Sequence, residues 1–156
     1  ITASDVLEAS GETLLTGSHK GWLFDLPNEG EKVLASAVTV LNKVVFTTFA
    51  SEKASSSDPC APPPNKARAY VLDLYSGAAV ANLDRSGDGS KDKSVVAGLN
   101  EILDSAQIIF NAPTASDGSA CTASDCQQTI QIRVGKMNLP IMDSMSRAGS
   151  VSVILP

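Results

Sequence analysis

Residues 84–92 read DRSGDGSKD, and side chains that carry oxygen recur along this stretch. Asp84, Ser86, Asp88 and Asp92 occupy its first, third, fifth and ninth positions. This spacing follows the start of an EF-hand-like calcium loop, in which a curled backbone turns alternate side chains inward. Ca²⁺ binds about six to eight oxygen atoms, and carboxylates and hydroxyls supply them. The spacing therefore predicts a calcium site.

The rest of the stretch fits a short aspartate loop better than a complete EF-hand. Gly89 stands at the sixth position, where the sharp turn needs a flexible backbone, and Ser90 offers its carbonyl. The twelfth position, where an EF-hand has a bidentate Glu, is Val95. The predicted metal ligands are therefore Asp84, Ser86, Asp88, Ser90 and Asp92.

A solvated polar turn is the alternative interpretation, because Asp, Ser and Gly are ordinary turn residues. One argument favours the metal. Without a cation the three aspartates repel one another, and the neighbouring basic residues offset that repulsion only in part. Those basic residues are Arg85, Lys91 and Lys93.

The other residues that could do chemistry are better explained as structure. His19 lies in GSHKG with no apparent catalytic partner, which favours a solvent-facing turn residue. Trp22 opens an apolar run and is expected to pack. Asp25 and Glu31 flank a Pro/Gly turn and make a poor pair of acids for hydrolysis. The three methionines, Met137, Met142 and Met145, are expected to fill gaps in the core.

The three cysteines favour an oxidising compartment. Cys121 and Cys126 lie in CTASDC, a loop short enough to close a small disulfide ring, and Cys60 is left over. A zinc site is a weak alternative, because there is one cysteine pair and the single histidine is far away in sequence. Three inert thiols in a reducing compartment remain the other alternative.

The elements that must position these residues are short strands. From Trp22 onward, runs such as WLFDL, VVFTTFA, ARAYVLDL, AQIIF and QTIQIRV alternate with segments rich in Pro, Gly, Asn and Ser. About eight strands of this kind predict an all-β fold. Sandwich, barrel and propeller are all compatible with the pattern. The nearly continuous apolar runs favour sheets covered on both faces, as in stacked propeller blades.

Turn residues predict where the chain reverses. Asn42-Lys43 between two strand-like runs indicates a hairpin, and Tyr75-Ser76-Gly77 indicates a second one in which Gly77 takes positive φ. Residues 50–66 contain four prolines and predict a long loop. Two segments have a weak helical pattern, residues 4–10 and residues 94–105.

Composition limits the class of protein. The chain of 156 residues is 43% hydrophobic but only 4% aromatic, which predicts a core of Val, Ile, Leu and Ala. A net charge of −5 without a basic run argues against a nucleic-acid partner. No apolar stretch reaches the ~18 residues of a membrane span. The chain begins at Ile1 without Met and stops in VSVILP, which we interpret as a fragment of a longer protein.

The order of several motifs resembles the C-terminal domain of the type IV pilus tip-associated adhesins, the PilC/PilY family. These motifs are Gly21-Trp22, Asp25-Leu26-Pro27, Gly30-Glu31-Lys32-Val33, Phe46-Thr47-Thr48, Asp58-Pro59-Cys60 and the hairpin from Tyr70 to Gly77. In that family an aspartate-rich loop commonly follows the hairpin, and DRSGDGSKD stands at that place. The strong part of the resemblance covers residues 20–92.

The resemblance implies a partial, modified β-propeller of about three blades. Residues 1–20 would lead into it, 21–83 would be its most propeller-like part, 84–92 the calcium loop and 93–156 the final strands. Tyr70 and Leu72 would pack between blades, and Asp73 would accept backbone N–H groups at the turn. Three blades do not close a ring, so missing chain or another molecule would complete the sheets.

The resemblance also implies a function and a location. The chain would be a non-enzymatic, calcium-modulated module that binds minor pilins and the pilus assembly machinery. It would support pilus extension, retraction and surface attachment. Its place would be the pilus tip at the surface of a Gram-negative bacterium, reached through the periplasm and outer membrane. Two alternatives share the Tyr-x-Leu-Asp hairpin: a quinoprotein-like propeller enzyme and a structural outer-membrane assembly scaffold.

Overall fold

The chain folds as β-structure throughout the part that we describe. The computed structural model describes residues 6–8, 19–51, 63–112, 127–140 and 143–146. Within them lie eleven strands and no helix. The strands are β1 (Val6–Glu8), β2 (Gly21–Leu23), β3 (Lys32–Val33), β4 (Val38–Val40), β5 (Lys43–Ser51), β6 (Asn65–Asp73), β7 (Ser94–Leu99), β8 (Gln107–Phe110), β9 (Gln127–Val134), β10 (Met137–Asn138) and β11 (Asp143–Ser146).

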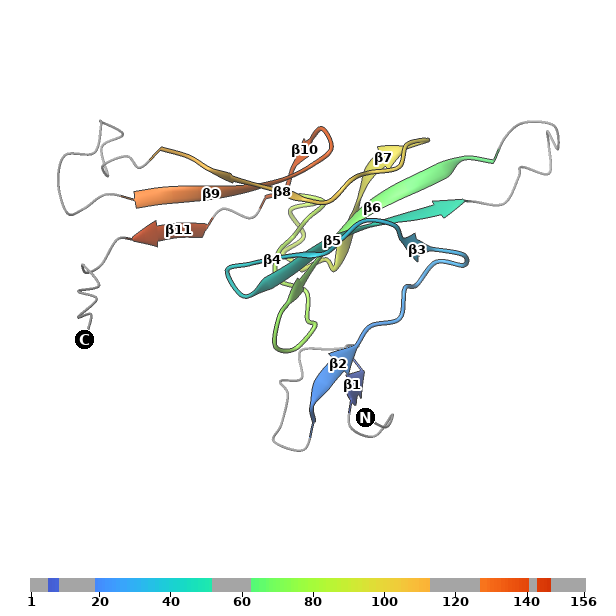
Figure 1. The fold of residues 1–156 in the computed structure, drawn as a ribbon, viewed down its shortest axis with the longest axis horizontal. Helices are drawn as coiled ribbons and strands as arrows, with labels where there is room; N and C mark the ends of the chain where they lie inside the picture. Colours follow the sequence, from blue (N-terminus) through green and yellow to red (C-terminus); the bar gives the residue numbers. More distant parts are fainter. Residues whose placement is uncertain (1–5, 9–18, 52–62, 113–126, 141–142, 147–156) are drawn as a thin grey trace, which may run out of the picture.

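The strands form three open sheets (Figure 1). A five-stranded antiparallel sheet has the order β3-β5-β6-β7, with β4 also paired to β5. A four-stranded antiparallel sheet has β9 paired with β8, β10 and β11. The short strands β1 and β2 pair in parallel. The all-β prediction is therefore confirmed, and none of these sheets closes on itself within the described residues.

Strand β6 is the centre of the larger sheet and is buried on both faces. It pairs with β5 over nine residues and with β7 on its other edge, where a bulge lies between Ala67 and Arg68. Successive residues of a strand point to opposite faces. Ala69, Tyr70, Val71 and Leu72 are all fully buried, so both faces are covered. Covered faces were expected for the runs VVFTTFA and AQIIF. The first, in β5, is largely buried, whereas the second, in β8, leaves Phe110 58% exposed.

One face of the larger sheet shares its core with the smaller sheet. Small and branched apolar residues of β5 and β6 form one cluster with Leu103, Ala106 and residues of β9. The buried members of that cluster are Val45, Ala67, Ala69, Val71, Leu83, Leu103, Ala106, Ile132, Val134 and Leu139. The Thr47 hydroxyl bonds to the carbonyls of Leu103 and Asp104, which holds the connection to the smaller sheet against β5. The core is aliphatic, as the composition predicts.

Aromatic rings and a turn cover the opposite face. The ring of Tyr70 stacks on Phe46 with centroids 5.0 Å apart and tilts against Phe24 at 5.6 Å. The Lys93 ammonium lies 4.9 Å from the centre of the Phe24 ring, a cation–π contact. Burial lowers the pKa of Lys93. Phe24, Phe46 and Tyr70 thus pack together on this face of the larger sheet.

Two local predictions are corrected by the structure. The two-residue turn between β4 and β5 is Leu41-Asn42, not Asn42-Lys43, because Val40 pairs with Lys43. Both turn residues have positive φ, 47° and 58°, as a type I′ turn requires. Residues 94–105 contain β7 rather than a helix, and Val6–Glu8 form a strand where residues 4–10 were expected to be helical.

The second predicted hairpin turn is confirmed. Gly77 has φ 66°, and its N–H donates to the Asp73 carbonyl at 2.9 Å. The Asp73 carboxylate accepts bonds from the backbone N–H groups of Tyr75 and Ser76 at 3.0 and 2.8 Å. This is the turn role that the sequence predicted for Asp73. No described residue belongs to a helix that could span a membrane.

Candidate functional site

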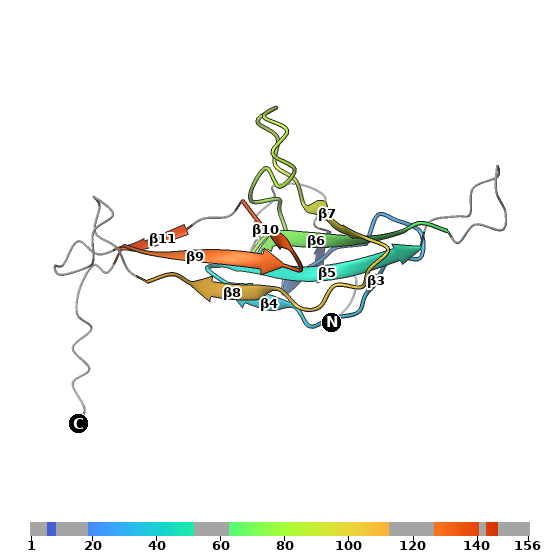
Figure 2. The same cartoon turned by 90° about the horizontal axis from the view of Figure 1, so that it is seen from above.

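The predicted calcium loop projects from the larger sheet between β6 and β7. Figure 2 shows this yellow-green segment extending away from the strands on either side of it. A bridge between Ala81 and Asp92 closes its base, and the Asp92 N–H donates to the Ala81 carbonyl at 2.8 Å. Residues 84–91 are all exposed. We call residues 82–92 the acidic loop.

The carboxylates of the acidic loop hold its backbone in shape. Asp84 accepts the N–H of Ser86 at 2.8 Å. Asp88 accepts both the N–H and the hydroxyl of Ser90, at 2.8 and 2.7 Å. These local turns curl the chain, and they leave the second oxygen of each carboxylate outside the bonds just described.

Asp92 acts at the base of the loop rather than at its tip. Its Oδ2 accepts the N–H of Leu83 at 3.0 Å and that of Asp84 at 3.4 Å. Gly87 and Gly89 take φ of 75° and 77°, in the region that favours glycine. The sixth-position role predicted for Gly89 is thereby supported, because a side chain there would be strained.

Asn82 is the residue that the sequence interpretation missed. Its amide nitrogen lies 3.2 Å from the Ser86 hydroxyl and 3.4 Å from Asp88 Oδ1. Its own carbonyl oxygen is buried and has no hydrogen-bond partner in the described part of the chain. A buried polar atom without a partner is uncommon and calls for a ligand, a water or a changed orientation. The amide nitrogen thus lies between the Ser86 hydroxyl and the Asp88 carboxylate.

A signal for Asn82 was present in the sequence. Oxygen-bearing side chains stand at every second residue from Asn82 to Asp92. The alternation therefore begins at Asn82, two residues before Asp84, where the predicted calcium loop begins. Two residues of the predicted set, Ser86 and Asp88, lie against Asn82.

The electrostatics of the loop centre on Asp88. Hydrogen bonds from the hydroxyl and backbone of Ser90, and from the Ser86 hydroxyl, lower the pKa of Asp88. The carboxylate is therefore ionised at neutral pH, as a calcium ligand must be. Lys93, which the sequence placed among the balancing cations, lies over Phe24 instead.

The acidic residues alone do not form a metal site in this conformation. No three acidic, His or Cys side chains of the described ranges lie close enough together to hold an ion. The oxygens that do gather come from Ser86, Asp88 and Ser90, beside the amide nitrogen of Asn82. The donor set consists of hard oxygens and suits Ca²⁺ in chemical type. Asp84 and Asp92 would have to approach this group to complete it.

Arg85 ties the loop to the smaller sheet. It has φ 58°, and its guanidinium donates to the Asn138 carbonyl at 3.3 Å. Asn138 belongs to β10, where it pairs with Arg133 of β9. A hollow of about 390 Å³ lies between these elements, lined by Leu83, Asp84, Arg85, Val95, Met137 and Asn138.

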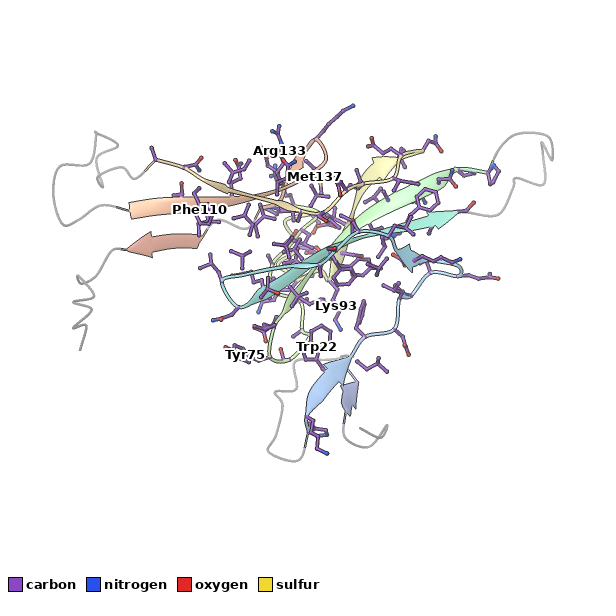
Figure 3. All side chains as sticks on the ribbon, viewed as in Figure 1. Trp22, Tyr75, Lys93, Phe110, Arg133 and Met137 are labelled. Atoms are coloured by element: carbon purple, nitrogen blue, oxygen red, sulfur yellow. The ribbon has the colours of Figure 1, made fainter. Side chains whose placement is uncertain are left out.

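The structural roles predicted for other residues are largely observed. The indole N–H of Trp22 donates to the Leu74 carbonyl at 2.8 Å, and Figure 3 shows its ring near Tyr75 in the hairpin after β6. Met137 packs against the core. His19 is half-buried rather than solvent-facing. The side chains of Met142 and Met145, and all three cysteines, lie outside the described residues.

Asp25 and Glu31 do not form a pair of acids. Asp25 is exposed, whereas Glu31 is buried and accepts bonds from the hydroxyls of Tyr70 and Thr48. The Glu31 carboxylate also accepts from the backbone and side-chain nitrogens of Asn28. Burial first, and Glu31 second, raise the pKa of Tyr70. Glu31 therefore anchors its turn to the sheet.

Comparison with known proteins found no relative of this chain. Neither the family models, nor the curated proteins, nor the solved structures contain a match to the chain.

Proposed function

We propose that the chain is a non-enzymatic module of a type IV pilus tip protein and that its acidic loop binds Ca²⁺. The support for the pilus assignment is the order of motifs over residues 20–92. The all-β fold is compatible with it. In the proposal, the open sheets are part of a propeller that further chain or a partner completes, at the bacterial surface.

One observation supports the calcium site above the others: the buried, unpartnered carbonyl oxygen of Asn82. The oxygen and nitrogen of an amide have nearly the same shape, so the two can exchange places when a cation replaces the donor. Exchanged, the Asn82 oxygen would face Ser86 and Asp88 as a third ligand. Asp84, Ser90 and Asp92 would supply further oxygens, because their loop is already curled by their own hydrogen bonds.

Binding would act mainly on the loop and its tether. The ion would offset the repulsion among three aspartates and hold the loop in one conformation. Arg85 would carry that restriction to β10 through its bond to Asn138. A stiffened surface that contacts minor pilins or the assembly machinery is how calcium would bias pilus extension against retraction.

Thermal unfolding tests the calcium part of the proposal. A ligand that binds only the folded state stabilises it by mass action. Calcium at about tenfold above its Kd should raise the Tm by about 3–6 °C for a chain of this size. Asp88→Ala should abolish the increase, whereas Asp104→Ala should keep it. Asp104 is a matched control, an exposed aspartate that accepts the N–H of Ser105 outside the acidic loop.

The pilus part is tested separately by binding of purified minor pilins to the immobilised chain. Calcium-dependent retention of a minor pilin, lost in Asp88→Ala, is the expected result. Retention of a minor pilin that does not depend on calcium would contradict regulation by the loop. No retention of any minor pilin would contradict the pilus assignment while leaving the calcium site to the thermal experiment.

A further inference from the structure

A cavity unconnected with the acidic loop lies at the far ends of β5 and β6. It has a volume of about 660 Å³. The turn of residues 27–30 forms one side of it, and Ala50, Ser51, Lys66 and Arg68 form the other. Ala50 pairs with Lys66 in the sheet, and Arg68 is two residues further along the same strand. Lys66 and Arg68 therefore share one face of β6 and lie about 7 Å apart along it.

The wall opposite these two cations is held in place by hydrogen bonds. The Glu31 N–H donates to the Asn28 carbonyl at 3.1 Å, and Gly30 has φ 71°. The Glu31 carboxylate accepts hydrogen bonds from the side-chain amide of Asn28 at 2.6 Å and from the Tyr70 hydroxyl at 2.9 Å. The Glu31 carboxylate thus anchors the turn to the sheet.

The lining is positive in a chain that is negative overall. Two bases and one acid, Glu29, line the cavity, which gives the lining a net charge of +1 against −5 for the whole chain. The Glu31 carboxylate, buried behind the turn, offsets this charge in part. Arg68 is half-buried and acts on Tyr70, lowering the pKa of that phenol in opposition to burial. Its side chain lines the cavity opposite the turn of residues 27–30.

Arg68 has donors to offer in this position. A guanidinium carries five N–H groups in a planar fork that matches a carboxylate. Within the ranges that the structure describes, no acceptor is hydrogen-bonded to Arg68. A half-buried cation in a preformed hollow is the usual arrangement for recognising a small anion.

We propose that this cavity binds the carboxylate group of a ligand, with Arg68 as its main partner and Lys66 as the second. The fork of Arg68 takes the two carboxylate oxygens, and the ammonium of Lys66 adds a point charge from the same face. Two kinds of molecule present this group, an acidic peptide side chain and a sugar acid. The hollow is large enough for either, since binding sites for small molecules start at about 300 Å³.

The experiment follows the Arg68 Nε–H signal of the whole 156-residue chain by NMR. N-acetylglutamate amide and glucuronate are the two carboxylate probes, each titrated against sodium chloride at equal ionic strength. We expect saturable shifts at Arg68, Lys66 and Gly30 with at least one probe. Stronger binding of one probe identifies the source, and equal binding shows that the carboxylate alone is recognised.

Variants make the assignment specific to the cavity. Arg68→Gln should weaken binding about tenfold or more, because it removes a charge-assisted pair. Arg68→Lys should retain part of the affinity, and Lys91→Gln on the acidic loop should retain all of it. Lys66→Gln, which removes the second cation, should weaken binding less than Arg68→Gln does, and it gives the test if Arg68→Gln does not fold.

Three results would overturn the proposal. The first is a set of NMR shifts that do not saturate, or that sodium chloride alone reproduces. Another is equal binding of inorganic phosphate, which would make the cavity a general anion site. The third is binding that survives both Arg68→Gln and Lys66→Gln.

Discussion

Strand β6 and the acidic loop are separated by a single hairpin, yet they use their residues in opposite ways. In β6, consecutive residues are fully buried and contact both faces of the sheet. In the acidic loop, the residues from Asp84 to Lys91 are exposed, and their hydrogen bonds run mainly within the loop. Stability is therefore concentrated in the strand, and the loop is free to respond to an ion without unfolding the sheet.

The largest expected effect comes from the core of β6. Leu72→Ala removes a fully buried side chain and should lower the free energy of unfolding by about 2–5 kcal/mol. Urea denaturation measures the change. Leu99→Ala is the matched control, because Leu99 is 64% exposed, and it should change the value by less than about 0.5 kcal/mol. Similar losses of stability in both variants would contradict the view that buried residues of β6 carry the stability of the sheet.

Tyr70→Phe should cost less, about 1–3 kcal/mol, because it keeps the ring contacts and removes one donor from the buried Glu31 carboxylate. Tyr75→Phe is its control, since Tyr75 is 56% exposed. Equal effects of the two variants would show that the Glu31 network does not contribute to stability.

The same tyrosine predicts a dependence on pH. The pKa of Tyr70 is raised in the folded chain, so above about pH 10 the unfolded state releases a proton that the folded state keeps. The free energy of unfolding should therefore fall as pH rises above 10. Urea titrations at several pH values should show a shallower fall in Tyr70→Phe. An identical slope would contradict the buried position of the phenol.

Backbone geometry predicts a smaller effect in the acidic loop. Gly89→Ala places a side chain at φ 77° and should cost about 1 kcal/mol of strain, although nothing lies within 4 Å to clash with it. Gly21→Ala is the control, because Gly21 also has open space and lies in strand β2. Urea denaturation of the two variants separates strain from crowding, and a larger loss at Gly21 would contradict the loop conformation.

Side-chain removal from the loop should have the smallest effect on stability. Without calcium, Asp88→Ala should leave the urea midpoint within error of the parent, because its hydrogen bonds are local and exposed. A large loss of stability would show that the loop supports the sheet, and it would contradict the view that stability is concentrated in β6.

The sequence predicted the parts of the fold that depend on local pattern. Apolar runs located β5, β6, β8 and β9, and the hairpin at Gly77 was predicted from turn residues, whereas the turn role of Asp73 was implied by the family resemblance. The turn at Leu41-Asn42 was displaced by one residue, because strand register forced a leucine to positive φ. The helical pattern of residues 94–105 was overridden by pairing of β7 with β6, a tertiary effect that no local pattern contains.

The candidate sites were predictable to different degrees. Spacing identified the acidic loop and Gly89, but the role of Asn82 followed only from its buried oxygen and from its amide nitrogen, which lies beside Ser86 and Asp88. The cavity beside Arg68 had no signal in sequence, since the turn at Asn28 is brought to β6 by the long-range hydrogen bond between Glu31 and Tyr70. A single sequence does not show contacts between segments that lie far apart along the chain.

The calcium proposal is tested most directly at Asn82. Its side-chain amide should be followed by NMR while Ca²⁺ is added up to about 10 mM, a range that covers extracellular calcium modules. We predict a saturable shift of the Asn82 amide signal, shared with Ser86 and Asp88, that Mg²⁺ does not reproduce. An Asn82 signal that stays unchanged through the titration would contradict the site.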